Sequence, residues 1–272
     1  MISVIIPTCN RNDLLGRCLS LLHPAIQQVD GSLYEVIVSD DSRENNAEAF
    51  IKTNFPWVKW RAAPKRGPAA NRNNGASGAV HEWLVFIDDD CLPKNDLLRE
   101  YMHAISVHPG ILAFEGSIIP DDWNLLKKDI AECPVNTGGE CFWSANICVQ
   151  KQLFNHLGGF DEQFLMAAQE DQDLYIRLQQ QTQTLFLDKC IVQHPVRFNS
   201  LLSKLKKLRP QFANWLYYQQ KHTNVPARKH LWKAAGDYIK FSVKEGMRLH
   251  VKLSILYAFT SVYCLGLVFK KQ

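Results

Sequence analysis

Two glycine-rich phosphate-binding signatures are missing from this sequence. Neither G-x-x-x-x-G-K-[ST] nor G-x-G-x-x-G occurs in its 272 residues, although 14 of them are glycine. The first signature is typical of nucleoside-triphosphate hydrolases and the second of dinucleotide-binding domains. The absence of both signatures therefore excludes a P-loop enzyme and a dehydrogenase of the Rossmann type.

The eight cysteines lack the spacing that zinc sites and redox pairs need. No C-x-x-C pair occurs among them, and they are scattered from Cys9 to Cys264. Such a pattern indicates reduced thiols in a cytosolic protein rather than a disulfide framework or a zinc site. The chain starts with a strand-like run, ISVIIP, without a basic region or a long apolar core, so we expect no secretory signal.

Acidic residues are scarce in the C-terminal part of the chain. Residues 200–272 contain 14 Lys and Arg but only two acids, Asp237 and Glu245, which gives this segment a formal charge of +12. The other residues contain 17 basic and 25 acidic side chains, a formal charge of −8. This division predicts a tail that faces an anionic partner and a body that holds a cation or shields its own charge.

The first 120 residues alternate short apolar runs with longer mixed segments, which predicts alternating strands and helices. Strands are expected at 2–7, 34–41, 58–63, 83–90 and 111–119, and helices at 12–22, 46–54, 69–80 and 95–107. Asn12-Asp13 and Asn95-Asp96 are expected to cap two of the helices. The alternation predicts an α/β fold with a mainly parallel sheet and helices on both faces.

Carboxylates follow two of the expected strands at their carboxyl ends. Asp40 and Asp41 end the second strand, and Asp88, Asp89 and Asp90 end the fourth. Parallel sheets bind ligands at this edge, although such acids also cap helices or solvate turns. Adjacent carboxylates repel one another unless a divalent cation lies among them, and Mg²⁺ or Mn²⁺ shares its ligands with phosphates. The pattern therefore favours a nucleoside-diphosphate site.

Two arginines lie between the acidic clusters. Arg66 and Arg72 belong to the stretch KRGPAANRNNG, a loop that leads into a helix. A guanidinium group can bind either phosphate or carboxylate. The two side chains are therefore expected either to bind phosphate or to pair with the acidic edge.

Four motifs follow one another in the order and spacing of a known family. IIPTCNR at 5–11, VSDDS at 38–42, RGPAANRNNGA at 66–76 and FIDDD at 86–90 resemble the motifs of family 2 glycosyltransferases, and further matches extend to about His194. The resemblance implies the GT-A fold, a Rossmann-like α/β fold with a mainly parallel mixed sheet. It also implies an inverting transferase that uses a UDP-, dTDP- or GDP-linked sugar and Mn²⁺ or Mg²⁺.

The resemblance assigns roles to single residues. It places the nucleotide sugar at Pro7, Thr8, Asp40, Asp41, Arg66, Asp88 and Asp89, and the metal at Asp88, Asp90 and His194. Within the acidic triplet, Asp88 is expected toward the ribose and Asp90 toward the metal, whereas Asp89 has no definite role. A lone histidine before a proline is also a common turn residue, so a structural role for His194 stays open.

The acceptor side is expected in the second half of the body. Residues 137–146, 157–162 and 169–174 resemble the family's glycine-containing stretch, its G-G-F-D-E turn and its E-D motif at the start of a helix. By this resemblance Asp171, or Glu170, accepts the proton of the acceptor hydroxyl as general base. The alternative is a capping role, since a helix dipole stabilises carboxylates near its N-terminus.

The basic tail is expected to form a helical extension, which divides the chain into domains 1–199 and 200–272. Pro210 and Pro226 are expected to separate its helical segments. Residues 253–269 carry no charge and would span about 26 Å as a helix, slightly less than a ~30 Å hydrocarbon core. An interfacial anchor is favoured over a helix packed on protein and over a true span, because lysines and aromatic residues share the tail.

The acceptor and the location follow only by analogy. We expect a saccharide or lipid-linked saccharide of cell-surface polysaccharide assembly, handled in the cytoplasm at the inner face of the membrane. Two alternatives remain: a nucleotidyl or phosphoryl transferase that uses the same acidic edge, and a non-catalytic protein that binds membranes or nucleic acid through the tail. No nucleic-acid-binding motif occurs, so no nucleic-acid partner is expected.

Overall fold

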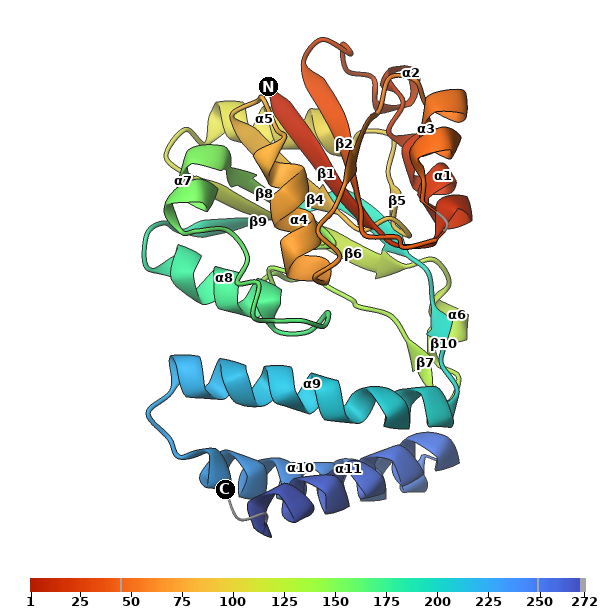
Figure 1. Cartoon of the computed structure of the whole chain (residues 1–272), viewed down its shortest axis with the longest axis vertical. Coiled ribbons are helices and arrows are strands. Elements are labelled where there is room, and N and C mark those ends of the chain that lie inside the picture. Colours follow the sequence, from red (N-terminus) through yellow and green to blue (C-terminus); the bar gives the residue numbers. More distant parts are fainter. Residues whose placement is uncertain (45, 249, 270–272) are drawn as a thin grey trace. The chain divides into compact units, whose positions relative to one another are not determined.

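The computed structural model describes residues 1–44, 46–248 and 250–269. The chain divides into two compact units (Figure 1). Met1–Asp121 and Pro134–Pro195 form the first unit, and Asp122–Cys133 and Val196–Gln272 form the second. The segment Asp122–Cys133 thus leaves the first unit and returns to it, a path that sequence periodicity did not indicate.

The first unit contains a mixed sheet of eight strands among the described residues, in the order β3-β2-β1-β4-β8-β6-β9-β5. The strands are β1 Ile2–Thr8, β2 Tyr34–Asp40, β3 Lys59–Ala62, β4 Trp83–Ile87, β5 Leu92–Pro93, β6 Ala113–Pro120, β8 Asn146–Gln150 and β9 Thr184–His194. β1 to β4 run parallel, whereas β8 runs antiparallel to both β4 and β6. This arrangement confirms the predicted mixed, Rossmann-like sheet.

Helices cover both faces of this sheet, as predicted. They are α1 Asn12–Leu21, α2 Pro24–Gln27, α3 Glu48–Asn54, α4 Pro68–Ser77, α5 Leu97–Val107, α7 Lys151–His156 and α8 Glu170–Gln179. Successive side chains of a strand point to opposite faces. In β1, Val4 and Ile6 therefore pack in one buried cluster with α1, α3 and α5, whereas Ile5 packs in a second with α4, α7 and α8.

Glycine allows α4 to lie close to the sheet. A Cβ atom at Gly75 would lie 2.5 Å from Cγ2 of Ile5 in β1, which is closer than real Cβ atoms come. Since α4 also carries Arg72, this close packing fixes the distance of that arginine from the sheet. A larger residue at position 75 would move both.

The two N-cap predictions hold only in part, since Asp96 does occupy the N-cap position of α5. α1 follows Arg11 and α5 follows Asp96, and neither of these flanking side chains makes a capping hydrogen bond within the described structure. Asn12 is instead the first residue of α1. The carboxylate of Asp96 pairs with Arg99 at 3.2 Å, so a local ion pair replaces the cap.

The fourth strand ends earlier than predicted. β4 stops at Ile87, and the three aspartates lie in a turn that the 3.0 Å bond from the Cys91 amide to the Asp88 carbonyl closes. The three acids therefore lie beyond the end of the strand. In the turn, each carboxylate can point in a direction of its own. A strand would have sent them alternately to its two faces.

The second unit consists mainly of three helices. Its elements are α6 Trp123–Leu126, β7 Ala131–Glu132, β10 Arg197–Phe198, α9 Leu201–His222, α10 Ala227–Met247 and α11 Val251–Phe269. Phe212 of α9, Leu231 of α10 and Cys264 of α11 belong to one buried cluster. The C-terminal helical region is thus present as predicted, with a small core of its own.

One of the two prolines does not divide the tail. Pro226 precedes α10 at its N-cap position, but Pro210 lies inside α9, which continues through it. A proline costs a helix one backbone hydrogen bond. Here the packing of Leu208, Phe212 and Trp215 around the cluster of the unit holds the helix together on both sides of Pro210.

Candidate active site

Parallel pairing brings the predicted donor residues to one edge of the sheet. Thr8 at the end of β1 pairs with Asp40 at the end of β2, and β4 runs parallel to β1 from the other side. The turn that follows Ile87 therefore emerges beside Thr8. The two acidic clusters share the carboxyl-terminal edge where ligands of such sheets bind.

The carboxylate of Asp89 joins β1 to the turn after β4. It is fully buried, accepts a 2.7 Å hydrogen bond from Oγ1 of Thr8 and lies 3.0 Å from Nη2 of Arg11. The other guanidinium nitrogen of Arg11, Nη1, lies 3.4 Å from Oδ2 of Asp90. Sequence reasoning missed Arg11, although a cation in the IIPTCNR motif was a signal that the aspartates need a counter-charge.

Asp90 and His194 form the best candidate for a metal centre. Nδ1 of His194 lies 3.0 Å from the Pro195 carbonyl oxygen, which only accepts, so Nδ1 carries the proton. Burial lowers the pKa of His194 and favours the neutral ring. Its Nε2 lone pair then faces Oδ1 of Asp90 at 3.6 Å. Two electron-pair donors at this distance suit a divalent cation between them.

Cys91 is a third group near this pair. Its thiol, the Asp90 carboxylate and the His194 ring each offer one atom within 4.8 Å of the others. Burial raises the pKa of the Cys91 thiol well above its usual value, so the sulfur stays protonated. A thiol is a poor ligand for Mn²⁺ or Mg²⁺, which prefer oxygen. The donor set of Asp90 and His194 fits the predicted cation, and Cys91 adds little to it.

Arg72 connects the acidic edge to the start of α8. Its side chain is 5% exposed, with Nη2 2.7 Å from Oδ1 of Asp88 and Nη1 3.2 Å from Oε1 of Glu170. Of the two alternatives for this arginine, the structure shows pairing with the acids. Although burial raises the pKa of Asp88, the guanidinium of Arg72 holds it below its ordinary value. Asp88 is therefore ionised and still 26% exposed.

The two acids that open α8 differ in environment. Glu170 is buried and accepts a 2.8 Å hydrogen bond from the Ala168 amide in addition to its ion pair with Arg72. Asp171 is partly exposed, and its Oδ1 accepts from the Gln172 amide at 2.8 Å. Burial and the neighbouring charge of Glu170 raise the pKa of Asp171 to about 7. A partly exposed carboxyl that titrates near neutrality suits proton transfer.

The remaining donor-side residues are engaged with the chain itself. Asp40 is buried and accepts from the Ala47 amide at 2.6 Å and from Nε1 of Trp60 at 3.1 Å. Asp41 is partly exposed and accepts from the Lys65 amide at 2.5 Å and from the Gly67 amide at 3.2 Å. Asp41 therefore orders the loop that leads into α4.

Arg66 and Pro7 complete the predicted donor set. Arg66 lies in the same loop, 62% exposed, with Nη2 2.8 Å from Oε2 of Glu162. Pro7 is buried within β1. The structure thus brings Pro7, Thr8 and the acids to one edge, whereas Arg66 pairs with an acid of the G-G-F-D-E turn.

A buried glutamate that sequence reasoning missed orders the stretch next to α8. Glu115 of β6 accepts hydrogen bonds from the Cys141 amide at 2.9 Å, from the Phe142 amide and from Nδ2 of Asn136 at 2.6 Å. Nε2 of Gln172 in α8 donates to the Cys141 carbonyl. This network holds residues 136–142 against the helix of Asp171. The signal in the sequence was a single glutamate inside the apolar run ILAFEGSII.

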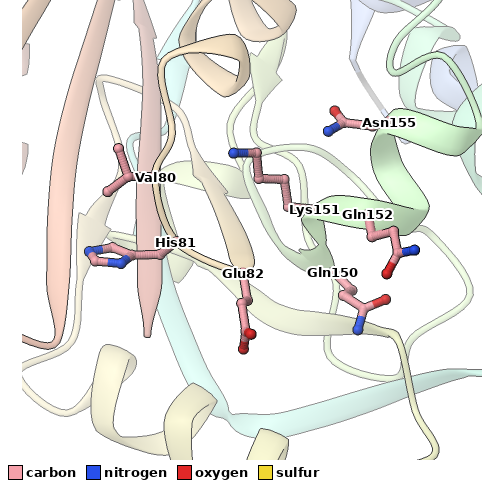
Figure 2. A pocket seen from close by; sticks show the side chains of 7 residues that line it. All are labelled: Val80, His81, Glu82, Gln150, Lys151, Gln152 and Asn155. Carbon is pink, nitrogen blue, oxygen red and sulfur yellow. The ribbon is translucent and has the colours of Figure 1, made fainter.

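A surface pocket lies at the other edge of the sheet. Figure 2 shows its lining, Val80, His81, Glu82, Gln150, Lys151, Gln152 and Asn155, around a volume of about 460 Å³. These residues lie just before β4, at the end of β8 and in α7, so they lie at the end of β4 away from the aspartates. Nζ of Lys151 donates to the Ala79 carbonyl at 2.6 Å. None of the predicted site residues lines this pocket.

Comparison with known sequences matches the motif region. A model of glycosyl transferase family 2 matches residues 3–156. An uncharacterised glycosyltransferase of Haemophilus influenzae is 25% identical over 192 residues, which cover 66% of this chain and 63% of that protein. The GalNAc(5)-diNAcBac-PP-undecaprenol beta-1,3-glucosyltransferase of Campylobacter jejuni is 34% identical over 94 residues, 33% of this chain and 29% of that protein. The chain spans less than two thirds of both relatives.

Comparison with solved structures concerns the fold. The mannosyltransferase PcManGT from Pyrobaculum calidifontis, in complex with GDP-Man and Mn²⁺, aligns with a TM-score of 0.60 at 17% identity. The alignment covers 97% of this chain and 86% of the other. This likeness confirms the predicted GT-A fold. The family match over more than half of the residues shows that the chain belongs to glycosyl transferase family 2.

Proposed function

We propose that this chain transfers a sugar from a nucleotide-diphosphate sugar to an acceptor hydroxyl and inverts the anomeric carbon. The observation that carries the proposal is the pair of acids at the start of α8. One of them, Glu170, forms an ion pair with Arg72, and burial together with the neighbouring charge of Glu170 raises the pKa of the other, Asp171, to about 7. Such a pair supports general base catalysis beside a charged donor site.

The exposure of the carboxylates divides the donor residues into two groups. Asp40 and Asp89 are buried and accept hydrogen bonds from the chain, so their role is to hold the edge in shape. Asp41 and Asp88 keep exposed surface and would contact the nucleotide sugar directly. Pro7 and Thr8 would border the base, and Arg66 would bind the nucleotide after leaving Glu162.

A divalent cation is part of the proposal. Asp90 and His194 would hold Mn²⁺ or Mg²⁺, which when bound offsets the charge that grows on the leaving diphosphate. Asp88 would support the site from its place beside Arg72. The presence of Mn²⁺ with GDP-Man in the Pyrobaculum relative supports this assignment.

The chain's own groups account for the proton and for the direction of attack. The acceptor hydroxyl gives its proton to the Asp171 carboxylate, and its oxygen forms a bond to the anomeric carbon. The bond from that carbon to the diphosphate oxygen breaks, and the nucleoside diphosphate leaves with both electrons. Because attack comes from the face opposite the leaving group, the configuration inverts. The Glu115 network would place residues 136–142 at the acceptor.

The acceptor that we propose is a saccharide or a lipid-linked saccharide of cell-surface polysaccharide assembly, and the transferred group a hexose or deoxyhexose. The undecaprenol-linked substrate in the name of the Campylobacter relative supports a lipid-linked acceptor. Such a substrate would place the enzyme in the cytoplasm at the inner face of the membrane.

The donor site is tested by thermal unfolding with UDP, dTDP, GDP and CMP, each with and without Mn²⁺. A ligand that binds only the folded state stabilises it by RT ln(1 + [L]/Kd). We expect one nucleoside diphosphate to raise the melting temperature in a Mn²⁺-dependent way, in the wild type and in Asp13→Ala but not in Asp90→Ala. Asp13 is a suitable control because it is an exposed acid of α1.

The product then separates two reactions on the same acidic edge. Release of a nucleoside diphosphate from a nucleotide sugar indicates sugar transfer. Release of pyrophosphate from a nucleoside triphosphate would indicate a nucleotidyl transferase and would contradict the proposal. Absence of any nucleotide-dependent shift in folded protein would contradict the donor site itself.

A further inference from the structure

The hairpin of α10 and α11 carries an exposed apolar stripe. The two helices lie side by side (Figure 1) and are joined by a 2.8 Å hydrogen bond from Oγ of Ser242 to the Ser254 carbonyl. α10 exposes Trp232, Ile239, Val243 and Met247, and α11 exposes Val251, Ile255, Phe259 and Val262. Their exposed fractions range from 38% to 75%, so each large apolar side chain meets water over more than a third of its surface.

Helical spacing places these side chains on one face of each helix. These positions are separated by seven, four and four residues in α10 and by four, four and three in α11, which is the repeat of one helix face. Phe241 of α10 is also 48% exposed, but it lies outside this repeat and its ring contacts those of Tyr238 and Tyr257. Leu231 of α10 and Cys264 of α11 belong to the buried faces, which pack with Phe212 of α9. The apolar stripe therefore lies on the side of the hairpin that α9 does not cover.

A row of lysines borders the stripe. Lys229, Lys233, Lys240 and Lys244 are exposed on α10, each next to the apolar face in the helical repeat. The acids nearby are paired: Asp237 lies 3.7 Å from Lys240, and Glu245 lies 3.3 Å from Arg248 and 2.7 Å from His250. The face is therefore apolar at its centre and positively charged along its α10 edge.

We infer that this face binds the anionic surface of a lipid bilayer. The apolar stripe would enter the boundary between headgroups and acyl chains, while the lysines contact lipid phosphates, as in interfacial amphipathic helices. The inference names the surface through which the enzyme of the proposed function would reach a lipid-linked acceptor. Only the biological purpose of membrane binding rests on the proposed function. The binding itself depends on the residues of α10 and α11 and not on the first unit.

Two other occupants fit the face less well. A second copy packed through the same face would meet the lysines with an apolar stripe and further lysines, which supply no counter-charge. A bilayer span by α11 is the other candidate, since Val251–Val268 has a mean hydropathy of 1.7, sufficient in length and composition. However, Cys264 and Val268 of α11 are buried in the unit's own core, and spanning would remove them from it. An interfacial position keeps this core intact.

The test is co-sedimentation of the full chain with vesicles of phosphatidylcholine alone and of phosphatidylcholine with phosphatidylglycerol. We expect binding to the anionic vesicles, weakened by high salt because the lysine contribution is screened. Lys233→Glu/Lys244→Glu should lower the binding constant at least roughly thirtyfold, since each lysine near an anionic surface contributes about fivefold. Ile239→Ser/Phe259→Ser should also lose binding to the same vesicles.

Matched controls separate this face from general charge and hydrophobicity. Lys206→Glu/Lys207→Glu changes two exposed lysines of α9 and reduces the charge equally, and Leu33→Ser/Val107→Ser changes two exposed apolar residues of the first unit. Both controls should keep most of the binding. Circular dichroism checks that each variant is folded. Quenching of tryptophan fluorescence by lipids brominated on the acyl chains gives a second readout in the wild type. This quenching should be lost in Trp232→Phe.

Three results would overturn the inference. The first is equal binding by the face variants and the wild type. The second is a wild-type dimer that Ile239→Ser/Phe259→Ser converts to a monomer, which would assign the face to a second copy. The third is no binding to anionic vesicles at all. Nucleotide-dependent thermal shifts without vesicles should be the same in all these variants, so failure of the docking face and failure of the proposed transferase are distinguishable.

Discussion

Nη1 of Arg72 lies 3.2 Å from Oε1 of Glu170, so a residue of α4 pairs with the buried first acid of α8. The residues are 98 positions apart in the chain. The same guanidinium reaches Asp88 at 2.7 Å. One side chain thus links the donor edge of the sheet to the helix that carries Asp171.

Removal of this arginine should be costly. Arg72→Ala leaves Glu170 buried without its counter-charge, which typically lowers the free energy of unfolding by about 3–5 kcal/mol. Urea denaturation measures the change. Arg99→Ala is the control, because Arg99 forms its ion pairs with Asp96 and Glu100 at the surface, and it should change stability by less than about 1 kcal/mol. Equal losses of unfolding free energy in the two variants would show that the Arg72 ion pairs stabilise the fold no more than exposed ones do.

The activity should depend on pH through Asp171. A general base must be ionised, so kcat/KM for transfer should rise with pH and level off above about 7, the pKa that burial and Glu170 give Asp171. Asp171→Asn should keep Mn²⁺-dependent donor binding and lose transfer. A pH profile without an ionisation near neutrality, or normal turnover by Asp171→Asn, would remove Asp171 from the mechanism.

The same group should affect stability with the opposite sign. Between the ordinary value of 3.8 and about 7, folded Asp171 holds a proton that the unfolded chain has released. Its contribution to stability is therefore complete below pH 3.8 and declines as the pH rises through about 7. Relative to Asp171→Asn, the wild type should lose stability over this window. Parallel urea titrations of the two proteins measure the difference.

The cation should be lost with either of its two ligands. His194→Gln removes the imidazole, and Asp90→Ala removes the carboxylate that faces it at 3.6 Å. Calorimetric titration with Mn²⁺ in the presence of the nucleoside diphosphate should show binding in the wild type and little in either variant. His81→Gln replaces a histidine of the opposite edge and should bind Mn²⁺ normally. Unchanged Mn²⁺ binding by His194→Gln would assign His194 a structural role only.

The buried glutamate should act on the acceptor and not on the donor. Glu115→Ala leaves the Cys141 and Phe142 amides and the Asn136 amide group without their common acceptor, at a cost of about 1–3 kcal/mol or more. The KM for the acceptor should rise while the nucleotide-dependent thermal shift stays as in the wild type. Glu115→Gln keeps an acceptor oxygen and should restore most of the loss. Equal changes in donor and acceptor binding would indicate a general folding defect.

The sequence predicted the sheet edge well because its signals are local. An apolar run that ends in an acid, as before Asp40 and Asp88, identifies a strand without information from the rest of the chain. Parallel pairing of β2 and β4 with β1 then brings the two acidic strand ends to the same edge. The sequence could not predict which carboxylates are exposed, since burial depends on distant partners such as Trp60 for Asp40 and Thr8 for Asp89. The Arg72–Glu170 ion pair could not be predicted for the same reason, because its two residues are far apart in the sequence.

Two departures from prediction have related causes. Pro210 was expected to divide the tail, but side chains on both sides of it pack into one core, and this tertiary packing outweighs the local cost of proline in α9. Asp96 was expected to cap α5, but an arginine three positions later competes for its carboxylate. In both cases a partner outside the immediate motif decides the local conformation.

The antiparallel strand β8 has a consequence for how such a chain can change. Ile87 at the end of β4 pairs with Asn146 at the start of β8, so the stretch before Asn146 arrives beside the aspartates from a separate part of the sequence. If the proposed function holds, exchanges in 136–145 would change the acceptor without shifting β1, β2 and β4, which carry the proposed donor residues. New acceptor preferences could then arise by replacement of one segment while the donor-binding strands are inherited unaltered.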